Sequence, residues 1–126
     1  MIKVPVSYGE LYDKITILQI KLDKFDDPAK LENVRRELDY LTDVAKQVPH
    51  HDDTAARVDE LRAINTDLWD IEEGKRAHER KQEFGESFIR LARDVYIKND
   101  RRAALKKQIN LLTGSAIMEE KSHADA

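Results

Sequence analysis

Apolar residues recur along most of the chain at steps of three and four, the spacing that places them on one face of an α-helix. The first such stretch covers residues 8–25 and the second covers residues 28–48. Ser7 and Glu10 have the capping-box spacing just ahead of the first stretch. Between the two stretches, Pro28 suits the first position of a new helix. The pattern therefore predicts two antiparallel helices joined by a tight turn.

After the loop PHHDDT, the periodic pattern resumes near Thr54 and continues to Ile71. The next residues, EEGKRAHERKQE, are almost wholly polar, and Gly85 offers a hinge because Gly tolerates backbone angles that other residues avoid. A fourth periodic stretch follows the hinge, and Gly114 is placed to end it. The third and fourth helices are thus longer than the first two, and their polar parts are expected to project beyond the compact core.

These elements predict an all-α fold, an antiparallel bundle of four main helices in which helices three and four form a longer hairpin. Residues 1–118 are expected to form one helical-bundle domain. Within it, residues 1–7 form an extended arm, because apolar residues alternate there around Pro5. Residues 119–126 are expected to form a flexible C-terminal tail.

Composition narrows the class of protein further. The chain has 126 residues, of which 37% are charged and 6% aromatic, a profile typical of long, solvent-facing helices. The formal net charge of −3 is too small to indicate a nucleic-acid or membrane partner for the whole chain. The absence of cysteine excludes disulfides and thiol chemistry. Because no stretch resembles a signal peptide or a membrane span, we expect a cytoplasmic protein without a membrane partner.

The segment YIKNDRRAALKKQIN, residues 96–110, interrupts the apolar rhythm. Asn99 and Arg102 fall where Leu or Ile is expected. Either Asn99 or Asp100 caps a new helix, or one continuous helix carries polar side chains into a packed seam. A break would place Arg101 and Arg102 in a first turn, where the helix dipole disfavours positive charge, and no Gly or Pro marks a boundary. A continuous helix is the favoured interpretation.

In a continuous helix, folding back at Gly85 places the basic residues near the acids of the segment WDIEE. The expected facing pairs are Trp69 with Arg101, Leu68 with Arg102 and Glu72 with Lys98. Such a cluster is either a structural ion-pair network that fixes helix register, or a pocket in which Arg forks bind a carboxylate or phosphate. The candidate ligand-binding residues are Trp69, Glu72, Tyr96, Asn99, Arg101, Arg102, Lys106 and Asn110. Bundles commonly pair such charges without any ligand, which favours the structural network.

The remaining motifs give weaker indications of a functional site. HHDD at residues 50–53 has metal-ligand residue types, but its spacing matches no metal motif, and a loop ending in a helix cap explains it. No phosphate-binding loop or nucleophile motif is present, so we expect no metal and no cofactor. Residues 86–113 hold seven basic and three acidic residues, but without interleaved aromatic residues, which argues against nucleic acid.

Four segments, VPVSYGELYDKITIL, LWDIEE, FIRLARDVYIKNDRRAALKKQIN and GSAIMEEKS, lie between residues 4 and 122 and so reach across most of the chain. In these segments the chain resembles a small uncharacterised family of bacterial and viral proteins. Some members of that family are labelled flagellin-regulatory, and similar sequences lie near surface-polysaccharide genes. The resemblance implies that these blocks belong together and supplies no catalytic residues.

Two functions follow as hypotheses. The first is a non-enzymatic interaction or assembly module, expected to be a homo-oligomer with a possible protein partner. The alternative is a binder of, or small enzyme acting on, an anionic small molecule that is phosphorylated or sugar-linked, as in surface-polysaccharide biosynthesis. In a structural network each Arg would form an ion pair with an acidic side chain. In a binding site Arg and Asn side chains would point into a cleft without such partners.

Overall fold

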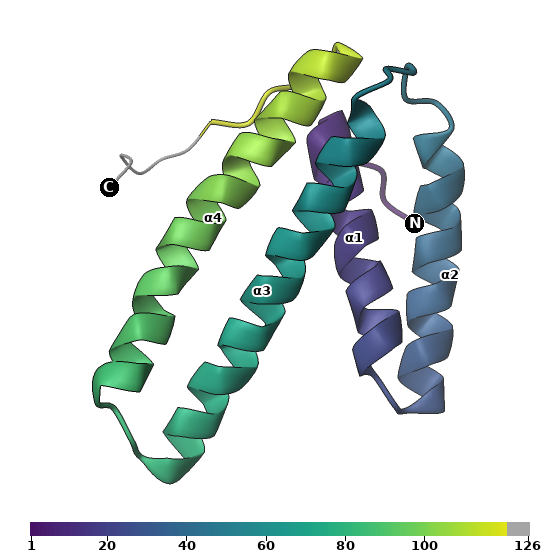
Figure 1. The fold of residues 1–126 in the computed structure, drawn as a ribbon. Helices are drawn as coiled ribbons and strands as arrows, with labels where there is room; N and C mark the ends of the chain where they lie inside the picture. Colours follow the sequence, from purple (N-terminus) through teal and green to yellow (C-terminus); the bar gives the residue numbers. More distant parts are fainter. Residues whose placement is uncertain (121–126) are drawn as a thin grey trace.

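The computed structural model describes residues 1–120, in which four α-helices and no strand are found. The helices are α1 (Tyr8–Lys24), α2 (Pro28–Ala45), α3 (Thr54–Lys81) and α4 (Glu86–Thr113). α3 and α4 each have 28 residues, against 17 and 18 for α1 and α2. They form a long antiparallel hairpin whose tip extends beyond the turn between α1 and α2 (Figure 1). The all-α fold and the longer second hairpin are confirmed.

α1 is the central helix of the fold. It packs against each of the other three helices, whereas α2 packs against α1 alone among the described helices. α2 accordingly stands beside α1, on the side away from α4 (Figure 1). Its amphipathic face buries only Val34 completely, and Leu31 and Leu38 remain half-buried. The arrangement is therefore a three-helix core of α1, α3 and α4 with α2 on its flank.

The hydrophobic core is small. Leu61 of α3 and Leu105 and Ile109 of α4 are fully buried, and Tyr12, Val58 and Ile64 pack around them. This cluster lies where α1 meets the hairpin. Toward the tip, Leu91 covers Gly74, and Phe84 and Phe88 meet edge to face with their ring centroids 5.2 Å apart. The tip is therefore held by the hairpin's own contacts.

α4 runs without interruption from Glu86 to Thr113, so the favoured interpretation of residues 96–110 as one helix is confirmed. The chain turns over residues 82–85, so the predicted hinge at Gly85 lies within the turn. The left-handed backbone conformation, however, is adopted by Gln82, which ends α3 with φ of 54°. Its side-chain amide also donates to the carbonyl of Glu79 at 2.8 Å. Gly85 has φ of −80° and precedes the first turn of α4.

The segment that precedes α1 and the described residues that follow α4 both lie near the start of α1. Residues 1–6 form neither helix nor strand, and the side chains of Ile2 and Val4 are 91% and 69% exposed. Ser115 and Glu119, which follow α4, hydrogen-bond to Tyr8 and Ser7 at the same place. The segment after α4 therefore covers the beginning of α1. Residues 121–126 of the predicted tail lie outside the described residues.

Within residues 1–120, no helix is both long enough and apolar enough to cross a membrane.

The beginning of α1 and the end of α4 approach each other very closely at Gly9. Its amide donates to Asn110 Oδ1 at 2.6 Å. A Cβ atom at position 9 would overlap the backbone carbonyl of Lys106 and lie 2.9 Å from Asn110 Oδ1. Because a helix backbone cannot yield as a flexible side chain can, this crossing requires a glycine.

We therefore expect Gly9→Ala to lower the free energy of unfolding by about 1 to 3 kcal/mol, the usual cost of overpacking a tight contact. Urea denaturation followed by circular dichroism measures this loss. Gly85→Ala is the matched control, because a Cβ there meets nothing within 4 Å and the backbone angle is ordinary. Equal stability of the two variants would contradict the close crossing.

Candidate functional site

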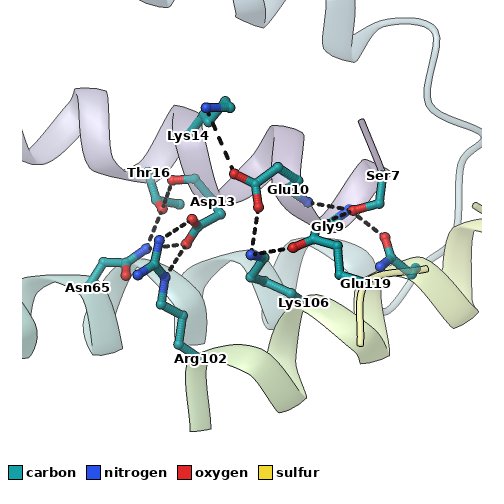
Figure 2. A network of polar contacts seen from close by, with 11 residues as sticks. Ser7, Gly9, Glu10, Asp13, Lys14, Thr16, Asn65, Arg102, Lys106 and Glu119 are labelled. Atoms are coloured by element: carbon teal, nitrogen blue, oxygen red, sulfur yellow. Dashed lines mark hydrogen bonds and ion pairs between the residues drawn. The ribbon is translucent and has the colours of Figure 1, made fainter. Parts of the chain in front are cut away.

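A buried carboxylate at the centre of α1 organises the polar interior. Asp13 is 1% exposed. Arg102 of α4 forms a bidentate pair with it, in which Nε donates to Oδ1 at 2.8 Å and Nη2 donates to Oδ2. Asn65 of α3 donates to Asp13 Oδ1 and to Thr16 Oγ1, both at 2.9 Å (Figure 2). One carboxylate thus joins α1 to both helices of the hairpin.

The charges of this pair reinforce each other. Burial by itself raises the pKa of Asp13. The hydrogen bonds from Arg102 and Asn65 and the positive charge of Arg102 outweigh it, so that the pKa lies below its ordinary value. The hydrogen bond to Asp13 raises the pKa of Arg102, against the opposing effect of burial. Both groups are therefore ionised at neutral pH.

A second polar cluster lies one helical turn further along α4. Lys106 Nζ pairs with Glu10 at 2.6 Å and with Glu119 at 3.2 Å. Ser7 Oγ donates to the other Glu119 oxygen at 2.9 Å and accepts from the amide of Glu10 at 3.0 Å (Figure 2). Burial lowers the pKa of Lys106, but its hydrogen bond to Glu10 and the surrounding carboxylates raise it overall. Lys106 is thus held in its charged form.

The first-turn amides of α1 are satisfied by the same region. The Tyr8 amide donates to Ser115 Oγ at 3.2 Å, the Gly9 amide to Asn110 Oδ1, and the Glu10 amide to Ser7 Oγ. The start of a helix leaves its first amides without partners inside the helix. Here the end of α4 and the segment after it supply them, which fixes the position of α1 along the hairpin.

The facing pairs expected between α3 and α4 are wrong. Lys98 pairs with Asp67 at 3.2 Å instead of Glu72, and Arg101 pairs with Glu60 at 2.7 Å instead of lying opposite Trp69. The turn at Gln82 moves the register toward the start of α3. Arg102 has its partner on α1 rather than α3, because the central helix lies against the seam between α3 and α4.

The eight candidate residues do not gather in one place. Trp69, Glu72 and Arg102 line a hollow of about 450 Å³ between α1 and α3, where Phe25 meets Trp69 with ring centroids 5.9 Å apart. Lys106 and Asn110 belong to the network at the start of α1. The other three are exposed: Tyr96, Asn99 and Arg101.

Sequence reasoning missed four members of the network, namely Asp13, Thr16, Asn65 and Glu119. It identified Ser7 as a helix cap, and the hydrogen bond from the Glu10 amide confirms that role. For Asp13 and Thr16 an indication was available. Apolar residues surround much of α1, with Ile17 and Ile20 widening its face, so few positions of that helix can meet water. A helix that is apolar on several sides is central to its fold. Its polar residues must then find partners within the protein.

The loop residues HHDD lie on the surface. His50 Nε2 lies 2.9 Å from Asp52, and His51 Nδ1 accepts from the amide of Asp53 at 3.1 Å. Within residues 1–120, no three metal-ligating side chains converge on one point. The imidazole of His51 instead bonds a backbone amide just before α3, which accounts for this residue type in local terms.

The fold and its polar interior define an all-α protein whose central helix is tied to a long hairpin by ion pairs. A family model described as a family of unknown function, DUF6165, matches residues 2–126. The chain therefore belongs to the DUF6165 family. No curated protein and no solved structure matches the chain.

Removing one side of the buried pair is expected to destabilise the fold. Arg102→Leu leaves the buried carboxylate of Asp13 without its ion-pair partner. We expect the free energy of unfolding to fall by about 2 to 4 kcal/mol. This is the lower range for a buried pair, because the Arg102 side chain is 30% exposed. Urea denaturation measures this. Arg36→Leu is the control, since Arg36 pairs with Glu32 on the surface and should cost at most about 1 kcal/mol. A fully stable Arg102→Leu variant would contradict a structural role.

The same pair predicts a pH dependence. The folded pKa of Asp13 lies below its unfolded value of about 3.9. Its stabilisation is therefore fully present above about pH 4 and is lost as the pH falls through the folded pKa. We expect the stability difference between the wild type and Asp13→Asn to be large at pH 7 and to shrink below pH 4 in urea titrations. A difference that is constant with pH would show that the carboxylate charge contributes nothing.

Proposed function

We propose that this member of the DUF6165 family is a non-enzymatic assembly module that associates with a second copy of itself. The observation that carries the proposal is a contrast between the interior and the surface. The cations at the centre of the predicted site are neutralised by the chain's own carboxylates, while large apolar side chains are left in water.

The interior half of this contrast concerns the bases that would attract an anion. Arg102 pairs with Asp13, Lys106 with Glu10 and Glu119, and Arg101 with Glu60. An incoming phosphate or carboxylate would have to displace a carboxylate that is already in place. The pairing therefore favours a structural role for this cluster, as expected of a closed network.

The surface half concerns exposed apolar area. α4 alone exposes Ile89, Tyr96, Ile97 and Leu111 by 42% to 65%. Contact with a second copy would remove these apolar side chains from water, which favours association.

We expect the purified protein to be a dimer with twice the 14.6 kDa chain mass. Sedimentation equilibrium at about 1 to 100 µM measures this, because even weak interfaces of standard size are populated in that range. A mass that stays monomeric across this range would overturn the proposal. Addition of salt should weaken a self-association that relies on charge pairs.

A second candidate is the binding of an anionic, sugar-linked small molecule in the 450 Å³ hollow between α1 and α3. It is favoured by the aromatic wall of Phe25 and Trp69 and by Arg76, which lines the hollow and has no ion pair within residues 1–120. Aromatic faces suit a sugar or base ring, and a free guanidinium suits a phosphate.

The sole tryptophan, Trp69, reports on this hollow directly. Titration with UDP-glucose would support the second candidate if fluorescence changed saturably in the wild type and not in Arg76→Gln. No change up to about 1 mM, the weak limit of specific small-ligand binding, would exclude this ligand.

A further inference from the structure

The hollow between α1 and α3 presents an unpaired acid as well as an unpaired base. Glu73 and Arg76 both line it, and neither forms an ion pair within residues 1–120. The other two charged residues of the hollow are already paired within the chain: Glu72 with Lys75 and Arg102 with Asp13. The charges that a ligand would meet there are therefore one carboxylate and one guanidinium.

Helical spacing orders the side chains along this hollow. Trp69, Glu73 and Arg76 follow one another on α3 at steps of four and three, which places them on one face of the helix. With a rise of about 1.5 Å per residue, Glu73 lies about 6 Å beyond Trp69 along the helix axis, and Arg76 lies about 4.5 Å further. The hollow thus presents an aromatic ring, then a negative charge, then a positive charge, in the direction of the hairpin tip.

The aromatic residues of the hollow favour a cation. The rings of Phe25 and Trp69 are tilted by 56° to each other, so they form an angled wall. Phe25 already contacts one cation, because Lys30 Nζ lies 5.7 Å from its ring centroid. The attraction between a cation and an aromatic face is strongest for Trp. An ammonium group beside Trp69 would be attracted both by the ring and by the Glu73 carboxylate.

The same charges make a purely anionic ligand a poor match for the hollow. A phosphate bound to Arg76 would lie within one helical turn of the Glu73 carboxylate, and like charges at such a distance repel each other. An ammonium group on the same ligand would replace this repulsion by attraction. The unpaired acid thus selects for a ligand that carries both charges.

We propose that the hollow binds a phosphate ester that also carries an ammonium group, with the phosphate on Arg76 and the ammonium between Trp69 and Glu73. The short axial step between Glu73 and Arg76 suits two charged groups on neighbouring carbon atoms. Phosphates of amino sugars and of amino alcohols share this chemistry, and a sugar ring would in addition lie against the aromatic wall. The proposal rests on the second candidate function above and names the class of its ligand.

Three sugar phosphates that differ in one ring substituent isolate the contribution of the ammonium: glucosamine 1-phosphate, N-acetylglucosamine 1-phosphate and glucose 1-phosphate. Fluorescence of Trp69, the sole tryptophan, follows their titration. We expect saturable binding of glucosamine 1-phosphate below about 1 mM. Its dissociation constant should be about five- to tenfold lower than those of the other two, as a charge pair and a cation–π contact at a partly exposed site predict.

Phosphoethanolamine carries the same two charged groups without a ring. Its binding would support the shared chemistry, and its affinity relative to glucosamine 1-phosphate measures what the sugar ring contributes.

Two variants separate the roles of the charges. Glu73→Gln should abolish the preference for glucosamine 1-phosphate without weakening the binding of glucose 1-phosphate, whereas Arg76→Gln should weaken both at least about tenfold. Glu79→Gln and Arg80→Gln are the matched controls, since they change the same residue types on the next turn of α3, and neither residue lines the hollow. Because Glu73 and Arg76 have no ion pair within residues 1–120, the variants should fold, as thermal unfolding would verify.

The possible results distinguish this proposal from the second candidate function. Equal affinities of the wild type for the three sugar phosphates, or a response to UDP-glucose alone, would overturn the ammonium group and leave the second candidate standing. A preference that survives in Glu73→Gln would overturn the place assigned to the ammonium. Absence of any fluorescence change with all of these compounds would overturn both. Self-association is measured independently by sedimentation equilibrium.

Discussion

The ionised carboxylate of Asp13, buried on the central helix, constrains the rest of the structure. An isolated charge in a protein interior is strongly unfavourable unless it is paired and hydrogen-bonded. Arg102 and Asn65 must therefore converge on it from two other helices. This requirement sets how far α1 enters the seam of the hairpin. It also accounts for the polar positions that interrupt the apolar rhythm of α4, since an Arg at position 102 lies on the packed side of one continuous helix.

The hydrophobic core that accompanies this network is modest. Within residues 1–120, Leu61, Leu105 and Ile109 form its fully buried centre, and six further apolar side chains, four of them on α1, are 4% to 7% exposed. Apolar packing is tolerant of sliding, whereas a bidentate ion pair is satisfied at one register only. The polar contacts at Asp13, Gly9 and Lys106 thus specify the arrangement of helices that a small core would leave loosely determined. We regard this as the structural reason for a charged interior.

The α3–α4 hairpin presents different kinds of residues toward α1 and toward solvent. Its inner side meets α1 through charges that are paired within the chain. α4 also leaves large apolar side chains exposed, among them Ile97 and Leu111. Among the described helices α2 packs on α1 alone, so it covers neither helix of the hairpin. The proposed self-association would bury apolar side chains that this arrangement leaves exposed.

The sequence by itself determined the helices. The steps of three and four, the Ser7 cap, Pro28 and the wide apolar face of α1 are local features, and local backbone preferences decide them. The membership of a polar network is different, because it depends on which helices meet. Arg102 was singled out as a polar residue in a packed seam, but Asp13 as its partner is 89 residues away in sequence. Only the tertiary structure decided that pair, because the turn at Gln82 and the packing of α1 against the hairpin set which residues meet. Burial then made the pairing of Asp13 with Arg102 necessary for the fold.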